Sequence, residues 1–256
     1  MEQGFALIAV CIGLFFISTL YSSVGHGGAS GYLALLSLTA FGQMDSAWLK
    51  QHAWVLNLAV ASLAFVHYSK NGHHVLSKSI PFLLASVPFA FVGGYLEVDG
   101  AIYDTLLSIT LIYAALRLYS GQHNTVEATF EPVRLQAYSF GAGIGFFSGI
   151  IGVGGGIFLS PILLLKKWAT PKTAAATAAL FIWVNSAAGL LGATASGQLD
   201  LEIDILFPFL FAVGIGGFIG SRYGSRYADQ KTVQNILIVV LLLASIKRII
   251  DILLLF

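Results

Sequence analysis

The sequence has 256 residues, of which 57% are hydrophobic and 10% charged, and its mean hydropathy is +0.84. These values are typical of a polytopic membrane protein and exclude an ordinary soluble domain. The formal net charge of +1, with no basic cluster, gives no electrostatic footprint for nucleic acid. The single cysteine, Cys11, excludes an intramolecular disulfide.

Apolar segments long enough to enter or cross a hydrocarbon core of about 30 Å recur along the whole chain. The first half predicts helices over 5–22, 29–41, 46–68, 79–96 and 101–118. The second half predicts helices over 135–150, 156–167, 171–195, 204–221 and 231–253. We therefore expect a first transmembrane repeat over 1–118, a polar connector over 119–134 and a second transmembrane repeat over 135–256.

The two halves share landmarks at a nearly constant separation, which indicates an internal repeat. Four pairs of residues lie 127 or 128 positions apart, in the same order in both halves: Gly25 and Gly152, Asn57 and Asn185, Pro81 and Pro208, and Gly93 and Gly220. An ordered set of this kind is not expected by chance.

Loop charge indicates that the halves have opposite orientations. In the first half, the loop after the third helix is basic and the next loop is acidic, with Lys70 and Lys78, then Glu97, Asp99 and Asp104. In the second half the order is reversed, with Asp200, Glu202 and Asp204, then Arg222, Arg226 and Lys231. Because cytoplasmic loops carry the Lys and Arg excess, this pattern predicts two inverted-topology repeats, the architecture of many secondary transporters.

The first two segments of each half predict a break inside the membrane. Residues 5–41 as one helix would be about 55 Å long, nearly twice the hydrocarbon thickness, so the chain must fold back. Glycines that permit the turn occur at Gly25, Gly27 and Gly28, and again at Gly152, Gly154, Gly155 and Gly156. Each half is thus expected to be a broken or re-entrant helical hairpin followed by three transmembrane helices, in an all-α protein.

Such breaks are candidate anion sites, because non-helical backbone at membrane depth must line a cavity or be buried in protein. The helix that leaves each break points its unpaired N–H groups and positive dipole end at the site. We expect Ser30 to cap the first of these helices and Pro161 to lie near the first turn of the second. The predicted substrate-binding residues of the two breaks are Gly25, His26, Gly27, Gly28, Ala29, Ser30, Gly152, Val153, Gly154, Gly155 and Gly156.

Polar side chains on other predicted helices add to this site. His26 could donate a hydrogen bond to an oxyanion, or it could carry a proton, since the unperturbed pKa of histidine is about 6.5. Alternatively, it could be a neutral ring that is hydrogen-bonded to a backbone carbonyl. Asn57 and Asn185 can each donate to an anion or join two helices. Lys50 and Trp54 share a helix face with Asn57 and could line a pathway, although Lys50 also fits a lysine that snorkels to the interface.

The segments "GHGGASGYLALL" and "GIIGVGGGIFLSPILLL" resemble the paired glycine motifs of the TauE/SafE family of sulfite exporters. The resemblance covers essentially the whole chain and implies export of a small anion such as sulfite or an organosulfonate, driven by an ion gradient, across the bacterial cell membrane. The second motif matches position by position at Gly152, Gly154, Gly155, Gly156 and Pro161. The first departs from it, with His26, Ala29 and Ala34 opposite Val153, Gly156 and Pro161.

The sequence therefore favours a secondary transporter that moves a small anion by alternating access, with no cofactor or metal. Its expected partners are the anion, membrane lipid and a coupling proton or other ion, while homo-oligomerisation is left open. An anion channel is an alternative that the sequence does not separate from a carrier. The string "GASG" also resembles the serine motif of rhomboid proteases, with Ser30 as nucleophile, but no histidine follows His123 and only His26 or His52 is a conceivable base.

Overall fold

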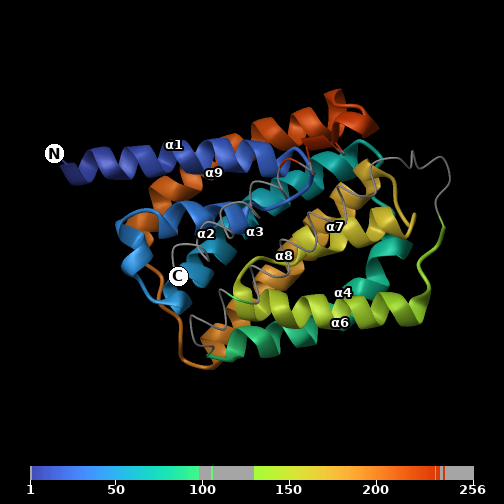
Figure 1. Ribbon diagram of the computed structural model, residues 1–256, viewed down its shortest axis with the longest axis horizontal. Coiled ribbons are helices and arrows are strands. Elements are labelled where there is room, and N and C mark those ends of the chain that lie inside the picture. The colour runs from blue at the N-terminus through green and yellow to red at the C-terminus, as the bar shows by residue number, and fades with distance from the viewer. Residues whose placement is uncertain (1, 98–104, 106–129, 234, 237–238, 240–256) are drawn as a thin grey trace.

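The computed structural model describes residues 2–97, 105, 130–233, 235–236 and 239, and this part of the chain is helical with connecting turns (Figure 1). Its elements, in chain order, are α1 (Glu2–Ser22), α2 (Ala29–Ser37), the 3-10 turn η1 (Ala40–Gln43), α3 (Ser46–Lys70), α4 (Leu76–Tyr95), α6 (Arg134–Ile151), α7 (Gly156–Leu165), α8 (Pro171–Ala195), α9 (Ile203–Arg222) and the π-helical turn η2 (Tyr223–Tyr227). These bounds agree closely with eight of the predicted helices. Most of the predicted helices over 101–118 and 231–253, and most of the predicted connector over 119–134, lie outside the described residues.

Four helices of the described part are long and apolar enough to cross a membrane: α3, α4, α8 and α9 together with its π-helical turn. The inner pair is α3 and α8, because 56% and 67% of the residues in their most apolar segments are buried. The corresponding shares for α4 and α9 are 33% and 39%. Exposed Leu84, Phe207 and Phe211 on the outer helices are large apolar side chains. In a polytopic membrane protein such side chains face lipid.

The outer helices pack in two pairs on opposite edges of the inner pair. Figure 1 shows α1 beside α9 along one edge and α4 beside α6 along the other, with α3 and α8 crossing between them. Both outer pairs are in close backbone contact, because a Cβ on Gly93 would collide with Phe146 O and a Cβ on Gly220 would collide with Thr19 O. The residues of the two contacts are related by 127 positions, because Gly220 lies 127 after Gly93 and Thr19 lies 127 before Phe146.

The acidic loops meet at one end of the bundle. Gln198 Nε2 donates to Tyr95 O at 2.8 Å, which joins the loop after α8 to the end of α4. Gln51 Nε2 donates to Gln198 O at 2.5 Å and ties the start of α3 to the same place. We call this the acidic end, defined by Glu97, Asp200 and Glu202.

The basic loops meet at the opposite end. Lys78 Nζ, at the start of α4, donates to Trp168 O at 2.7 Å, beyond the end of α7. Lys172 Nζ, at the start of α8, donates to Ser225 O at 3.3 Å, beyond the end of α9. We call this the basic end, defined by Lys70, Lys78, Lys166, Lys167, Lys172 and Arg222.

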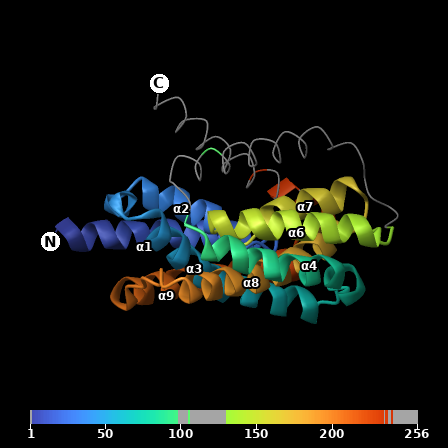
Figure 2. The ribbon, with the colours of Figure 1, turned by 90° about the horizontal axis from the view of Figure 1, so that it is seen from below.

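Each half of the chain folds back at its glycine-rich segment, as the length argument predicts. In the first hairpin, the position of a Cβ on Gly31 lies 2.5 Å from Ile17, and that on Gly13 lies 2.7 Å from Leu35, so α2 runs antiparallel to α1. The returning helices α2 and α7 have only 9 and 10 residues, about half the length that crosses a membrane. Figures 1 and 2 show that they extend toward opposite ends of the bundle.

Candidate functional site

The first break, residues 23–28, is called the first tip, and Tyr32 of α2 packs against it. Gly25 and Gly28 have φ values of 76° and 103°, which a residue with a Cβ adopts only at a cost in energy. Gly28 is the N-cap of α2, and a Cβ there would collide with the Tyr32 ring. The Tyr32 hydroxyl donates to Gly27 O at 2.6 Å, so this unwound carbonyl has a partner within the protein.

The second break, residues 152–155, is called the second tip. Gly152 ends α6 at φ 88°, and Gly155 is the N-cap of α7 at φ 81°. Val153 is buried in an apolar cluster, and Gly156 packs against Ile182 of α8. Both tips are therefore built by glycines at positive φ, which is the reason that the sequence pattern locates them.

The two tips meet at the side chain of Asn57, in the middle of α3. Its Oδ1 accepts from the backbone N–H of Ala29 at 3.1 Å, the first residue of α2, and its Nδ2 donates to Ser186 Oγ on α8 at 3.3 Å. A Cβ on Gly27 would collide with this amide, and one on Gly154 would lie 2.9 Å from its Nδ2. One buried amide thus separates the start of α2 from the second tip.

His26 joins the first tip to α7. Its Nδ1 lies 3.1 Å from Val24 O and its Nε2 lies 3.3 Å from Ser160 Oγ. Because a carbonyl can only accept, Nδ1 carries the proton, and Nε2 of the neutral ring then accepts from the serine hydroxyl. The buried ring therefore has the carbonyl partner expected for a neutral histidine, and it also contacts the helix that leaves the other tip.

Two expectations about the returning helices are wrong. Ser30 does not cap α2, because Gly28 is the N-cap and the Ser30 hydroxyl donates to Tyr21 Oη at 3.1 Å. Pro161 lies in the second turn of α7, which begins at Gly156, and not in its first. In both cases a glycine at positive φ, Gly28 or Gly155, is the N-cap, so the helix begins earlier in the sequence than the serine or proline indicates.

Asn185 differs from Asn57, its counterpart at the shift of 128. Both side chains are fully buried. Whereas Asn57 uses both amide atoms, neither Oδ1 nor Nδ2 of Asn185 has a hydrogen-bond partner among the described residues. The structure therefore gives Asn57 a helix-joining role and leaves the donor of Asn185 unused.

Lys50 and Trp54 lie on the second-tip side of α3. The ammonium of Lys50 is 5.9 Å from the centre of the Trp54 ring and donates to Leu96 O at 3.4 Å, at the acidic end. Its Cβ lies 2.6 Å from the position of a Cβ on Gly152. Lys50 is buried, with 3% of its surface exposed, so it packs inside the bundle and is not a lysine on the lipid face.

Sequence reasoning missed several residues at this site. Ser160 and Ser186 bond His26 and Asn57, and Tyr32 closes the first tip. A sequence signal exists for Ser186, which directly follows a midspan asparagine, but none separates Ser160 from the other serines of the membrane helices. These partners depend on how helices cross, which helical periodicity does not encode.

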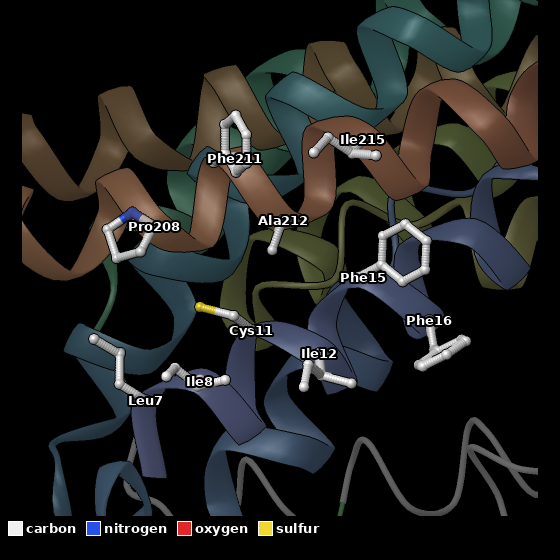
Figure 3. A pocket seen from close by; sticks show the side chains of 10 residues that line it. All are labelled: Leu7, Ile8, Cys11, Ile12, Phe15, Phe16, Pro208, Phe211, Ala212 and Ile215. Carbon is white, nitrogen blue, oxygen red and sulfur yellow. The ribbon is translucent and has the colours of Figure 1, made fainter. Parts of the chain in front are cut away.

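A groove on the outside of the bundle is separate from this site. It lies between α1 and α9, and its wall is carbon apart from the thiol of Cys11, as Figure 3 shows. Leu7, Phe15, Phe211 and Ile215 are among its lining residues, and it contains none of the predicted site residues. An apolar groove on the outer helices of a membrane protein suits a lipid chain and has no polar group to bind an anion.

Comparison with known proteins identifies the group to which this architecture belongs. Residues 10–248 match the model of the family described as "Sulfite exporter TauE/SafE". The chain belongs to the TauE/SafE family. It is an integral, multi-pass membrane protein, and the family is one of membrane transporters with small anionic substrates.

Curated relatives of this TauE/SafE protein carry transporter names. The probable membrane transporter protein y4hK of Sinorhizobium fredii is 34% identical over 247 residues, which cover 94% of this chain and 97% of the relative. YunE of Bacillus subtilis, also a probable membrane transporter, is 25% identical over 76% of this chain and 80% of its own length. MJ0441 of Methanocaldococcus jannaschii is 34% identical over 44% of this chain and 43% of its own. No solved structure gives a significant match.

The glycines of the second tip offer a test with a matched control. Gly154 and Gly197 have similar φ values, 71° and 78°, but a Cβ on Gly154 would press on Asn57, whereas one on Gly197 would meet nothing within 4 Å. Both alanine variants should lose about 1–2 kcal/mol of stability from the positive φ. Only Gly154→Ala should also abolish anion transport, measured in proteoliposomes with matched protein content. Equal transport by the two variants would contradict a role for the close contact at the tip.

Proposed function

We propose that this protein is a secondary carrier that exports a small oxyanion, sulfite or an organosulfonate, across the bacterial cell membrane by alternating access. The observation that carries the proposal is the meeting of the two tips at Asn57. The half-length helices α2 and α7 begin there and extend to opposite ends of the bundle. In the proposed carrier, one site near the midplane is therefore connected to each membrane surface by one of these helices. Discontinuous helices at a repeat interface are where secondary transporters bind substrate.

The repeats proposed for this carrier are inverted. Each is a broken helical hairpin followed by three transmembrane helices, over residues 1–118 and 135–256, with 119–134 as the connector. The repeated Gly93 and Gly220 contacts support the repeat. The gathering of acidic and basic loops at opposite ends supports the inversion, and the positive-inside rule orients the basic end to the cytoplasm.

An anion is the substrate that suits the tips. The proposed contacts are residues 25–30 and 152–156, which contain no Asp or Glu. The first N–H groups of α2 and α7 have no partner within their own helices, and the positive ends of both helix dipoles point to the midplane. The family description names sulfite as the exported substrate, which favours a sulfur oxyanion for this member.

His26 is the proposed link to a coupling proton. Protonation of Nε2 would remove the acceptor of the Ser160 hydroxyl and so alter the contact between the first tip and α7. Imidazole is the side chain whose charge changes most readily between about pH 5 and 8. A proton on this ring would therefore change the contact between the first tip, which leads into α2, and Ser160 of α7.

Removal of the imidazole should uncouple transport from pH. We expect His26→Ala to lower sulfite efflux from proteoliposomes and to flatten its pH profile, with unchanged protein content of the membrane. His74→Ala is the control, because His74 lies in the loop after α3, where its Nε2 is 3.1 Å from Ser79 Oγ in the first turn of α4. If His26→Ala keeps the pH profile of the wild type, His26 has no part in coupling.

Two alternatives differ in what they require of the site. An anion channel would use the same tips, and bilayer recordings with currents too large for a carrier would establish it. A rhomboid-like protease would need a base beside Ser30, whose hydroxyl instead bonds Tyr21 Oη. The conceivable bases bond elsewhere, His26 to Val24 O and His52 to Trp48 O.

The proposal is tested by transport in proteoliposomes against a panel of anions. We expect efflux of sulfite or sulfoacetate to exceed that of acetate and to respond to an imposed pH gradient, with sulfate and thiosulfate as further members of the panel. Empty liposomes give the background leak. Indifference to every anion would contradict the proposed function.

A further inference from the structure

Three polar side chains inside the bundle have no hydrogen-bond partner among the described residues. They are the indole Nε1 of Trp54 on α3, the hydroxyl of Ser148 on α6 and both amide atoms of Asn185 on α8. All three residues are fully buried. The other buried side-chain atoms without a partner among the described residues, Ser69 Oγ and Gln198 Oε1, lie at the ends of the bundle. Buried polar atoms are nearly always paired, so three unpaired donors in one region need an explanation.

Ser148 borders the second tip. Its Cβ lies 3.3 Å from the position of a Cβ on Gly155, the N-cap of α7. The ring of Phe181 reaches the same position from α8, at 2.8 Å. The second tip is therefore enclosed by α6 on one side and α8 on the other.

The region extends from the second tip along α8, through Asn185, to the place where Trp54 of α3 packs on this helix. Asn185 lies one turn after Phe181 and one turn before Gly189, so the three residues share a helix face. The indole of Trp54 packs on Gly189, with Cζ2 at 2.7 Å and Cε2, the neighbour of Nε1, at 2.9 Å from the position of a Cβ. The unpaired amide thus lies between the second tip and the unpaired indole.

Lys50 supplies a positive charge to one side of this region. Its stem packs on Gly152, and its ammonium lies 5.9 Å from the Trp54 ring, toward the acidic end. The region therefore combines three uncharged donors with a cation on the route to the membrane surface. A buried arrangement of this composition favours an anion.

The first tip lacks this composition. At the shifts of 127 and 128 that align the halves, Ile182 replaces Trp54, Ala178 replaces Lys50 and Tyr21 replaces Ser148. Tyr21 already accepts a hydrogen bond from Ser30, and Asn57 already accepts one from Ala29. The geometry of the glycines is shared by both tips, but the unpaired donors belong to the second.

We propose that the side-chain donors to the substrate oxyanion all lie at the second tip and are Trp54 Nε1, Ser148 Oγ and Asn185 Nδ2. Lys50 attracts the anion from the acidic end, and the first tip, which Asn57 holds in place, contributes no side-chain donor. This inference rests on the proposed anion transport. The three donors come from three helices and equal in number the three oxygens of sulfite or of a sulfonate group.

The test is calorimetric titration of the purified full-length protein with sodium sulfite and sodium methanesulfonate. Trp54→Phe, Ser148→Ala and Asn185→Leu should each weaken binding roughly 10- to 100-fold, as expected for the loss of one hydrogen bond to a charged group. Each variant removes a polar group that has no hydrogen-bond partner among the described residues, so no hydrogen bond between these residues is lost. Ser148→Ala should therefore melt like the wild type, whereas Trp54→Phe also loses packing on Gly189 and should melt at a slightly lower temperature while remaining folded. Asn185→Ala replaces Asn185→Leu if leucine does not fit.

Matched controls come from the same helices. Trp183→Phe removes an indole of α8 that is 42% exposed, and Ser139→Ala removes a hydroxyl of α6 that bonds Leu135 O, so both should bind like the wild type. Wild-type binding of sulfite together with unchanged binding by the three site variants would overturn this inference and leave the proposed function intact. Failure of the wild type to bind either anion would contradict both.

Discussion

The fold depends on one constraint, that unwound backbone inside a membrane must find its hydrogen bonds within the protein. The amide of Asn57 meets this constraint for the first tip, because it accepts from Ala29 N–H and donates to Ser186 on α8. The second tip lies close to the same amide, because a Cβ on Gly154 would be 2.9 Å from Asn57 Nδ2. One side chain therefore lies between the starts of the two half-length helices.

The pseudo-symmetry of the backbone contrasts with the asymmetry of the chemistry. Backbone contacts recur at a shift of 127 because close helix packing needs only glycines at corresponding positions. The hydrogen bonds of the two midspan asparagines differ, since Asn57 is paired and Asn185 has no partner among the described residues. In the proposed inverted arrangement, access from the two sides requires both tips, whereas binding requires only one set of donors. The two requirements can therefore be met by different halves.

The sequence predicts the breaks well, because a segment of this length must fold back and glycine marks where it does so. The gathering of acidic and basic loops at opposite ends also follows from their charge, and the internal repeat stays a prediction that the spacing of the glycines supports. The sequence could not show that Ser30 bonds Tyr21 and leaves the capping of α2 to Gly28. The sequence predicts Trp54 but not Ser148 as a candidate residue, because a single serine one turn before Gly152 forms no recognisable pattern. Ser148 comes to lie beside the second tip only when α6, α7 and α8 pack together.

The central claim is that one oxyanion site is opened alternately to the two sides of the membrane. Counterflow tests it most directly, with proteoliposomes loaded with unlabelled sulfite and diluted into a trace of radiolabelled sulfite. A carrier that has released unlabelled sulfite outside returns with labelled sulfite, and inside the label competes with excess unlabelled sulfite for exit. The proposal therefore predicts that label accumulates transiently in the vesicles above its equilibrium level. Rapid equilibration without such an overshoot, in vesicles that conduct sulfite, would contradict alternating access and indicate a channel.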